Sequence, residues 1–130
     1  MVINIPEVPG VEVPEPNNRI LKTLMCPELE NSDDHTILIS IIKSGNATGI
    51  HTHEADEYMY VATGRGEAVT VKEDGEEIVE DVEPDSLIFA PQGETHSIRN
   101  TGPETLKLFC VYSPALDASG KFQESIDIQE

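Results

Sequence analysis

Residues 45–64 read GNATGIHTHEADEYMYVATG, and residues 91–100 read PQGETHSIRN. Side chains alternate between the two faces of an extended strand, so His51, His53 and Glu57 share one face. His96, on a separate predicted strand, adds a third imidazole. A set of three imidazoles and one carboxylate suits a divalent transition metal, so the two segments together predict a metal site.

A histidine pair of the form H-x-H is ambiguous by itself, because two polar residues at the edge of a sheet give the same pattern. Glu57 at the same parity and His96 in the second segment favour the metal site. These donors do not select among Mn, Fe, Co, Ni, Cu and Zn. Four protein ligands leave two positions open on an octahedral ion, as in a working site, whereas a tetrahedral zinc site would be closed. The remaining histidine, His35, lies in an acidic loop and is interpreted as a surface residue.

Both segments resemble the signature motifs of the cupin superfamily, and the chain is similar to its small, single-domain, metal-binding members of the conserved-barrel type. The first motif, G-x5-H-x-H-x3-E-x6-G, and the second, P-x-G-x2-H-x3-N, match at Gly45, His51, His53, Glu57, Gly64, Pro91, Gly93, His96 and Asn100. The family usually opens the second motif with glycine where this chain has Asp85, and aspartate reaches glycine-like backbone angles less easily. The resemblance implies an all-β fold, the cupin double-stranded β-helix or jelly-roll barrel, and a homodimer.

Short runs rich in β-branched residues, separated by turn residues, indicate an all-β sandwich or barrel without intervening helices. The expected strands are 19–24, 36–43, 50–53, 57–62, 67–72, 76–79, 86–90, 95–100 and 105–113. Asp74-Gly75 predicts a hairpin between two alternating runs. We expect residues 1–24 to form an extended, proline-rich arm and the first strand, 25–114 the barrel, and 115–130 a tail with a short helix near 119–125.

Strand parity also predicts the surroundings of the metal site. Met59 and Val61 follow Glu57 on the same face and are expected to line a pocket, together with Ile98 beside His96. Tyr58 and Tyr60 then face the opposite side, where they suit sheet packing or a subunit contact. The face of Tyr112 on the last strand is not fixed by the pattern; it is a candidate proton donor or acceptor, or a packed tyrosine.

Composition limits the classes of function. The 130 residues fit one domain, which excludes a duplicated barrel or a fused DNA-binding domain. The chain has 25 acidic and 8 basic residues and a formal charge of −17, which disfavours nucleic acid and anionic membranes as partners. The first residues lack the pattern of a secretory signal, and Cys26 and Cys110 lack metal-type spacing. We therefore expect a cytoplasmic protein with reduced thiols.

Two hypotheses follow for the activity. The resemblance implies a small metal-dependent enzyme acting on an oxygenated small molecule, with isomerase or lyase chemistry preferred to a dioxygenase because Glu57 completes a four-ligand set. Oxidative chemistry remains a subclass. The alternative is a non-catalytic barrel that binds a small ligand or metal as a store, sensor or accessory protein. A purely structural barrel, in which the fold persists and the metal site is vestigial, would have neither activity. Polar groups converging beside an open metal position would favour the enzyme, and a wholly apolar cavity would favour binding.

Overall fold

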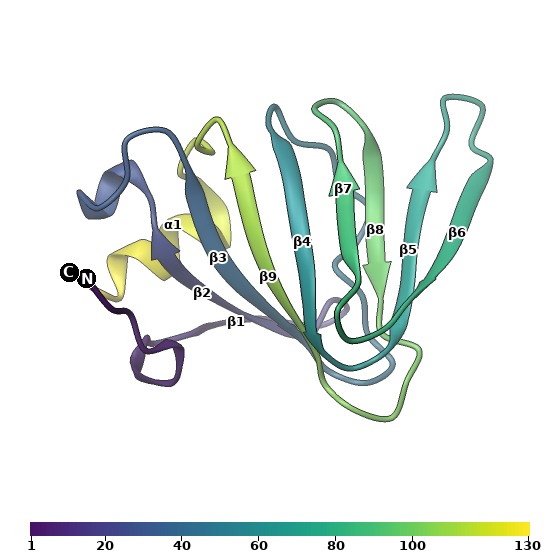
Figure 1. Ribbon diagram of the computed structural model, residues 1–130, viewed down its shortest axis with the longest axis horizontal. Coiled ribbons are helices and arrows are strands. Elements are labelled where there is room, and N and C mark those ends of the chain that lie inside the picture. Colours follow the sequence, from purple (N-terminus) through teal and green to yellow (C-terminus); the bar gives the residue numbers. More distant parts are fainter.

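The computed structural model describes residues 1–130, which form two antiparallel β-sheets and one C-terminal helix (Figure 1). The larger sheet has six strands in the order β1-β2-β3-β9-β4-β7, and the smaller has three in the order β6-β5-β8. The strands are β1 (Val11–Val13), β2 (Arg19–Met25), β3 (Thr36–Ile42), β4 (Asp56–Thr63), β5 (Gly66–Val71), β6 (Glu77–Val82), β7 (Leu87–Ala90), β8 (Thr95–Arg99) and β9 (Leu106–Ser113). The arrangement is the cupin jelly-roll fold that the sequence predicted.

The core lies between the sheets and follows from side-chain alternation along the strands. In β9 every second residue is buried, beginning with Leu106 and ending with Tyr112. In β4 the buried positions are Glu57, Met59 and Val61, while the tyrosines between them are exposed. The inward residues of both sheets form one apolar cluster. A single core agrees with a single domain.

The hairpin predicted at Asp74-Gly75 is confirmed. Strands β5 and β6 pair antiparallel with Val71 opposite Glu77, and Gly75 has a φ of +88° in the connecting turn. Glycine takes this left-handed conformation without steric cost.

The N-terminal arm is less extended than its prolines suggested. Residues Ile5–Glu7 form one turn of 3₁₀ helix (η1), with proline in its first turn, and Val11–Val13 form β1 at the edge of the larger sheet. Proline is tolerated at the start of a helical turn because the N–H that it lacks would have no partner there. A second 3₁₀ turn, η2, spans Pro27–Leu29.

The C-terminal tail contains the short helix that the sequence predicted, α1 (Gly120–Asp127), which lies against β2 (Figure 1). Its buried Ser125 hydroxyl lies 2.5 Å from the hydroxyl of Thr23, and Gln129 donates a hydrogen bond to the Thr23 carbonyl at 2.8 Å. These contacts hold the tail against β2. The helix is far too short and polar to cross a membrane, and no other helix in the structure meets that requirement either.

One predicted strand is wrong. Residues 50–53 do not form a regular strand; the segment from Ala47 to His51 instead pairs with β8 through two isolated bridges, Ala47 with Arg99 and His51 with His96. Gly49 interrupts the pairing because its φ is +81°, outside the β region. The segment is therefore an irregular extension of the smaller sheet, and it carries the first metal-ligand candidate.

Candidate metal centre

Four side chains from four parts of the chain converge between the two sheets. His51 comes from the irregular segment, His53 from the loop after it, Glu57 from β4 and His96 from β8. One potential ligand atom from each residue lies within 4.8 Å of all the others. Glu57 and His96 are buried, and the other two histidines are half-buried. The structure thus brings together the four residues that the two sequence motifs singled out.

Backbone carbonyls orient two of the imidazoles. Nδ1 of His51 lies 3.0 Å from the carbonyl oxygen of Gly49, and Nδ1 of His96 lies 2.9 Å from that of Glu94. A carbonyl can only accept a hydrogen bond, so each Nδ1 carries the proton. In neutral His51 this leaves the Nε2 lone pair free to bind a metal, and His96 reaches the same state when its Nε2 loses a proton, an arrangement typical of metal-ligating histidines.

The electrostatics of the cluster keep His51 neutral. Burial, and after it the neighbouring His96 and His53, lower the pKa of His51 to about 4. Burial likewise lowers the pKa of His53, although the charge of Glu57 opposes this. At neutral pH both rings are therefore uncharged, which is the form that coordinates a metal ion.

Glu57 and His96 form a charge-assisted hydrogen-bonded pair. Nε2 of His96 donates a hydrogen bond to Oε1 of Glu57 at 2.9 Å. Burial acts to lower the pKa of His96, but the hydrogen bonds to Glu57 and Glu94 outweigh it and raise the pKa. Burial acts to raise the pKa of Glu57, yet hydrogen bonding by His96 and Tyr112 and the nearby histidine charges lower it. The carboxylate is thus ionised and available as a ligand.

The donor set fits a divalent metal ion. Three imidazole nitrogens and one carboxylate oxygen are neither very soft nor very hard ligands, and together they carry one negative charge. First-row transition metals accept this combination. His51, His53, Glu57 and His96 are the residues that would hold the ion. Their atoms do not distinguish one such metal from another.

Tyr112 lies beside this cluster. It pairs with Glu57 across β9 and β4, which resolves the parity that the sequence left open and places the side chain inside the barrel. Its ring meets that of His53 edge-on at 5.1 Å between centroids. Burial and then the charge of Glu57 raise the pKa of Tyr112 well above its usual value, so the phenol stays protonated.

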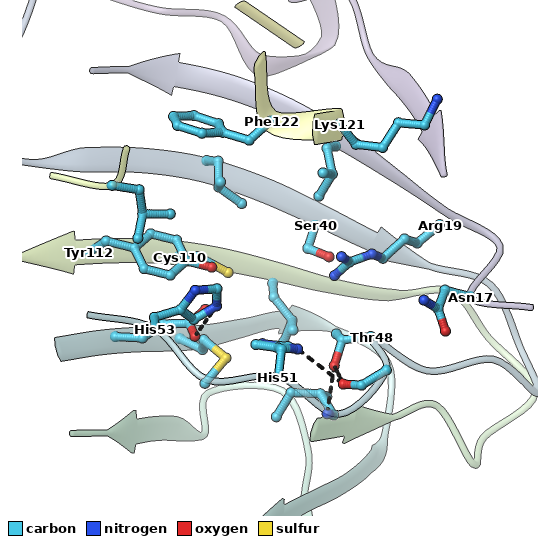
Figure 2. Close-up of a pocket in the computed structure, with 18 of the residues that line it drawn as sticks. Asn17, Arg19, Ser40, Thr48, His51, His53, Cys110, Tyr112, Lys121 and Phe122 are labelled. Carbon is cyan, nitrogen blue, oxygen red and sulfur yellow. Dashed lines mark hydrogen bonds and ion pairs between the residues drawn. The ribbon is translucent and has the colours of Figure 1, made fainter. Parts of the chain in front are cut away.

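A cavity of about 440 Å³ lies beside the cluster and is lined by three of its members, His51, His53 and Glu57 (Figure 2). Met59 and Ile98 line it, as strand parity predicted. Val61 does not; it has no exposed surface and lies in the core two residues further along β4. Parity correctly gives the face of the strand, but the cavity ends before Val61.

The cavity also has polar walls that the sequence analysis did not single out. Asn17 and Arg19 reach it from β2 and the turn before it, Ser40 from β3, and Thr48 from the irregular segment (Figure 2). One signal in the sequence pointed to Arg19: it is two residues from the apolar Leu21, so strand alternation places both side chains on the inward face. That signal is weak at the first residue of a strand.

Asp85 occupies the motif position where the cupin pattern usually has glycine. Its φ of +74° is the left-handed conformation that glycine adopts easily. Its carboxylate accepts a hydrogen bond from the hydroxyl of Tyr60, which is exposed on the outer face. The turn geometry is therefore kept despite the substitution, and the ligand cluster is unaffected.

The family model of the cupin domain matches residues 38–112. The chain belongs to the cupin family. The match spans β3 to Tyr112 of β9 and includes all four candidate ligands. One curated relative, the uncharacterized protein YrkC of Bacillus subtilis, is 31% identical over 83 residues, which is 62% of this chain. The match spans only 45% of that relative's length.

Solved cupin structures share the fold. A predicted oxalate decarboxylase from Thermotoga maritima is 21% identical with a TM-score of 0.74, and the alignment covers 88% of this chain and 99% of that one. A mutant of oxalate decarboxylase from Bacillus subtilis is 20% identical with a TM-score of 0.76, over 91% of this chain and 30% of the enzyme. The cupin domain of Schizosaccharomyces pombe Cnp3 is 13% identical with a TM-score of 0.70, over 85% and 72%. At these identities the similarity establishes the fold.

Proposed function

We propose that this cupin is a metal-dependent enzyme that acts on a small oxygenated molecule. The observation that carries the proposal is the position of the four-ligand cluster at the wall of a cavity that also contains neutral and charged polar groups. A structural metal site would be enclosed by its ligands, whereas a working site opens onto space for a substrate. A metal ion bound there would supply Lewis acidity toward an oxygen atom of the substrate.

Residues of the chain provide the accompanying proton chemistry. Tyr112 remains protonated beside Glu57, so its hydroxyl can donate a hydrogen bond or a proton to a molecule in the cavity. Met59, Ile98 and Leu108 provide apolar walls that exclude water from the reacting groups. We assign Tyr112 as the general acid or hydrogen-bond donor of the reaction.

We prefer an isomerase or lyase reaction to dioxygen insertion. The complete four-ligand set, including Glu57, supports this choice. Two of the solved structures with the same fold are described as oxalate decarboxylases, and decarboxylation is a lyase reaction. Cleavage or rearrangement of a small oxygenated acid is therefore the first chemistry to test.

The competing function is a non-catalytic barrel that stores or senses a metal or small ligand. A wholly apolar cavity would have favoured it. The polar walls formed by Arg19, Ser40 and Thr48 support the enzyme instead, because a reacting molecule must be oriented by specific contacts.

The test begins with elemental analysis of the purified protein and continues with a screen of small oxygenated acids and sugars. A ligand at a hundred times its dissociation constant stabilises the folded state by about 2.7 kcal/mol, which a thermal melt detects. Compounds that stabilise are then assayed for conversion by NMR. Protein that contains metal and binds compounds but converts none of them would support the non-catalytic function.

A further inference from the structure

Arg19 is an exception among the arginines of this chain. Arg65 pairs with Glu83 at 2.7 Å and Arg99 pairs with Glu77 at 3.0 Å, both at the surface. Arg19 forms none of the ion pairs in the structure, although the chain has 25 acidic residues. Its Nε is buried and has no hydrogen-bond partner. Leaving a buried N–H of a guanidinium without a partner is costly, so a folded protein that keeps one has a use for it.

A second unpartnered polar group lies on the neighbouring strand. The Ser40 hydroxyl on β3 is also buried without a hydrogen bond, and Arg19 and Ser40 are the only two residues with such atoms in the structure. Both line the cavity that contains the candidate metal ligands. In Figure 2 the guanidinium of Arg19 points toward Ser40, with Asn17 at the same end of the cavity.

Two neighbouring hydrogen-bond donors without partners, at one wall of a cavity, form a binding site for a hydrogen-bond acceptor. A guanidinium presents a planar fork of N–H groups that matches the two oxygens of a carboxylate, and a hydroxyl adds a further donor. We propose that Arg19 and Ser40 bind a carboxylate group of the substrate, while another oxygen of the same molecule faces the metal cluster. The proposal rests on the proposed function and narrows its substrate class to small carboxylic acids.

The charge balance of the cavity favours a carboxylate over a phosphate. Arg19 is the one arginine there, Lys121 is already paired with Glu124 at 3.1 Å, and Asp117 also lines the wall. A single available guanidinium neutralises a monoanionic carboxylate. A phosphate near its dianionic form would leave uncompensated charge in the half-buried site beside Glu57.

Arg19 would have a purely structural role if its guanidinium formed an ion pair with the ligand cluster. Burial lowers the pKa of Arg19, and the acidic groups Tyr112, Cys110 and Glu57 only partly oppose this. Glu57 directs its carboxylate to His96 at 2.9 Å and not to Arg19. The guanidinium is therefore not part of the structural pairing of the core.

The experiment measures binding of acetate, malonate and succinate by isothermal titration calorimetry to the protein as purified and after chelator treatment. Malonamide, a neutral analogue, and inorganic phosphate are titrated in parallel. We expect Arg19→Gln to weaken binding of the tightest carboxylate by about 10- to 100-fold, since a hydrogen bond to a charged group is lost. Arg19→Lys should give an intermediate loss because it keeps the charge without the fork. Ser40→Ala should weaken binding by about 5-fold.

Thermal stability separates a binding role from a structural one. Arg19→Met removes a charged side chain whose buried Nε has no partner, so its melting temperature should equal or exceed that of the wild type while carboxylate binding is lost. Arg65→Gln is the matched control: it removes one positive charge at the surface and should change neither property.

Several results would overturn the proposal. These are failure of the wild type to bind any of the three acids, equal binding by the Arg19→Gln variant, tighter binding of phosphate or malonamide than of the acids, or a large destabilisation by Arg19→Met. The outcome is separable from that of the proposed function. Absence of metal from the purified protein would remove the enzyme proposal, yet the effect of Arg19→Gln on the chelator-treated protein would still be measurable.

Discussion

Glu57 and His96 belong to different sheets, yet their side chains meet at 2.9 Å in the interior of the barrel. Glu57 is the buried second residue of β4, and His96 is the buried second residue of β8. Because each motif contributes one of them, the contact joins the two motif segments through side chains as well as through the His51–His96 bridge. The candidate metal site therefore depends on correct packing of the two sheets.

Replacing His96 with alanine should remove the metal without unfolding the barrel. The substitution deletes one of four ligands, and the remaining three hold a divalent ion much more weakly. We expect metal content to fall by at least tenfold and any turnover to be lost, with the folded state retained by circular dichroism. Elemental analysis and thermal melts measure the two effects.

Val61→Ala is the matched control for His96→Ala. Val61 is fully buried on β4 but lies outside the cavity. Its truncation should destabilise the fold by about 2 kcal/mol, from lost apolar burial and the cavity left behind, while metal content stays near the wild-type value. A His96→Ala protein with full metal content would exclude His96 from the site.

The pH dependence of metal binding should reflect one proton, the proton on Nε2 of His96, that competes with the metal ion. His51 and His53 have lowered pKa values, with that of His51 at about 4, whereas His96 has a raised pKa. As pH falls through the raised pKa of His96, a proton on its Nε2 competes with the metal, while His51 and His53, whose pKa values are lowered, become protonated only at lower pH. Affinity should therefore fall about tenfold per pH unit once the pH is below the pKa of His96, and more steeply near pH 4, where His51 also titrates.

Competition with a chelator of known affinity, repeated across this pH range, measures that slope. If the three histidines titrated together near pH 6.5, affinity would fall about a thousandfold per unit. A slope of that size, or metal that remains bound at pH 4 with undiminished affinity, would contradict the pKa shifts described here.

The ligand residues could be predicted from sequence because their relation is mostly local. Glu57 and Met59 lie on β4, where strand alternation fixes the direction of the side chains, and His53 lies in the loop three residues before that strand. The prediction survived an error in secondary structure: the segment around His51 is irregular, but its bridge to His96 turns the imidazole inward all the same. The match to two motifs supplied the distant partner.

The rest of the site depends on pairings that a sequence does not display. Strand β9 is apolar on both faces, with Phe109 and Val111 outward and Cys110 and Tyr112 inward, so no alternation reveals which face is which. Arg19 reaches the cavity only because β2 pairs with β3 in the observed register. The register between these two strands is set by the packed fold and not by either strand alone.

Tyr112→Phe tests the proposed proton donor. The substitution keeps the ring that packs against His53 and removes only the hydroxyl. If Tyr112 donates a proton in the reaction, kcat should fall by about 10²- to 10⁴-fold with metal content unchanged. Tyr58→Phe, on the exposed outer face, is the control and should leave kcat unaltered. Equal kcat values for the wild type and the Tyr112→Phe variant would make Tyr112 a packing residue.

The outer face of β4 and β7 carries a group of exposed apolar side chains. Tyr58 pairs with Phe89, and Tyr60 pairs with Leu87, across the edge of the larger sheet. Their exposed fractions are 40%, 50%, 41% and 69% in that order. Phe109, opposite Tyr60 on β9, continues this surface toward a second cavity of about 260 Å³ lined by the first residues of the arm. Apolar patches of this kind on a highly charged protein mark contact surfaces.

We propose that this surface joins two copies of the chain in a two-fold homodimer, with the N-terminal arm at its margin. The four side chains are uncharged, so they mark the place where two molecules of net charge −17 approach with least repulsion.

Each residue of a two-fold interface is used twice, which doubles the effect of a substitution. Leu87→Glu should therefore weaken the dimer by at least about 100-fold, with the barrel intact because the side chain is exposed. Sedimentation velocity over micromolar concentrations measures the shift, and Val79→Glu on β6 of the other sheet, 44% exposed, is the control. A wild-type monomer at tens of micromolar, or a dimer disrupted by Val79→Glu and not by Leu87→Glu, would contradict this interface.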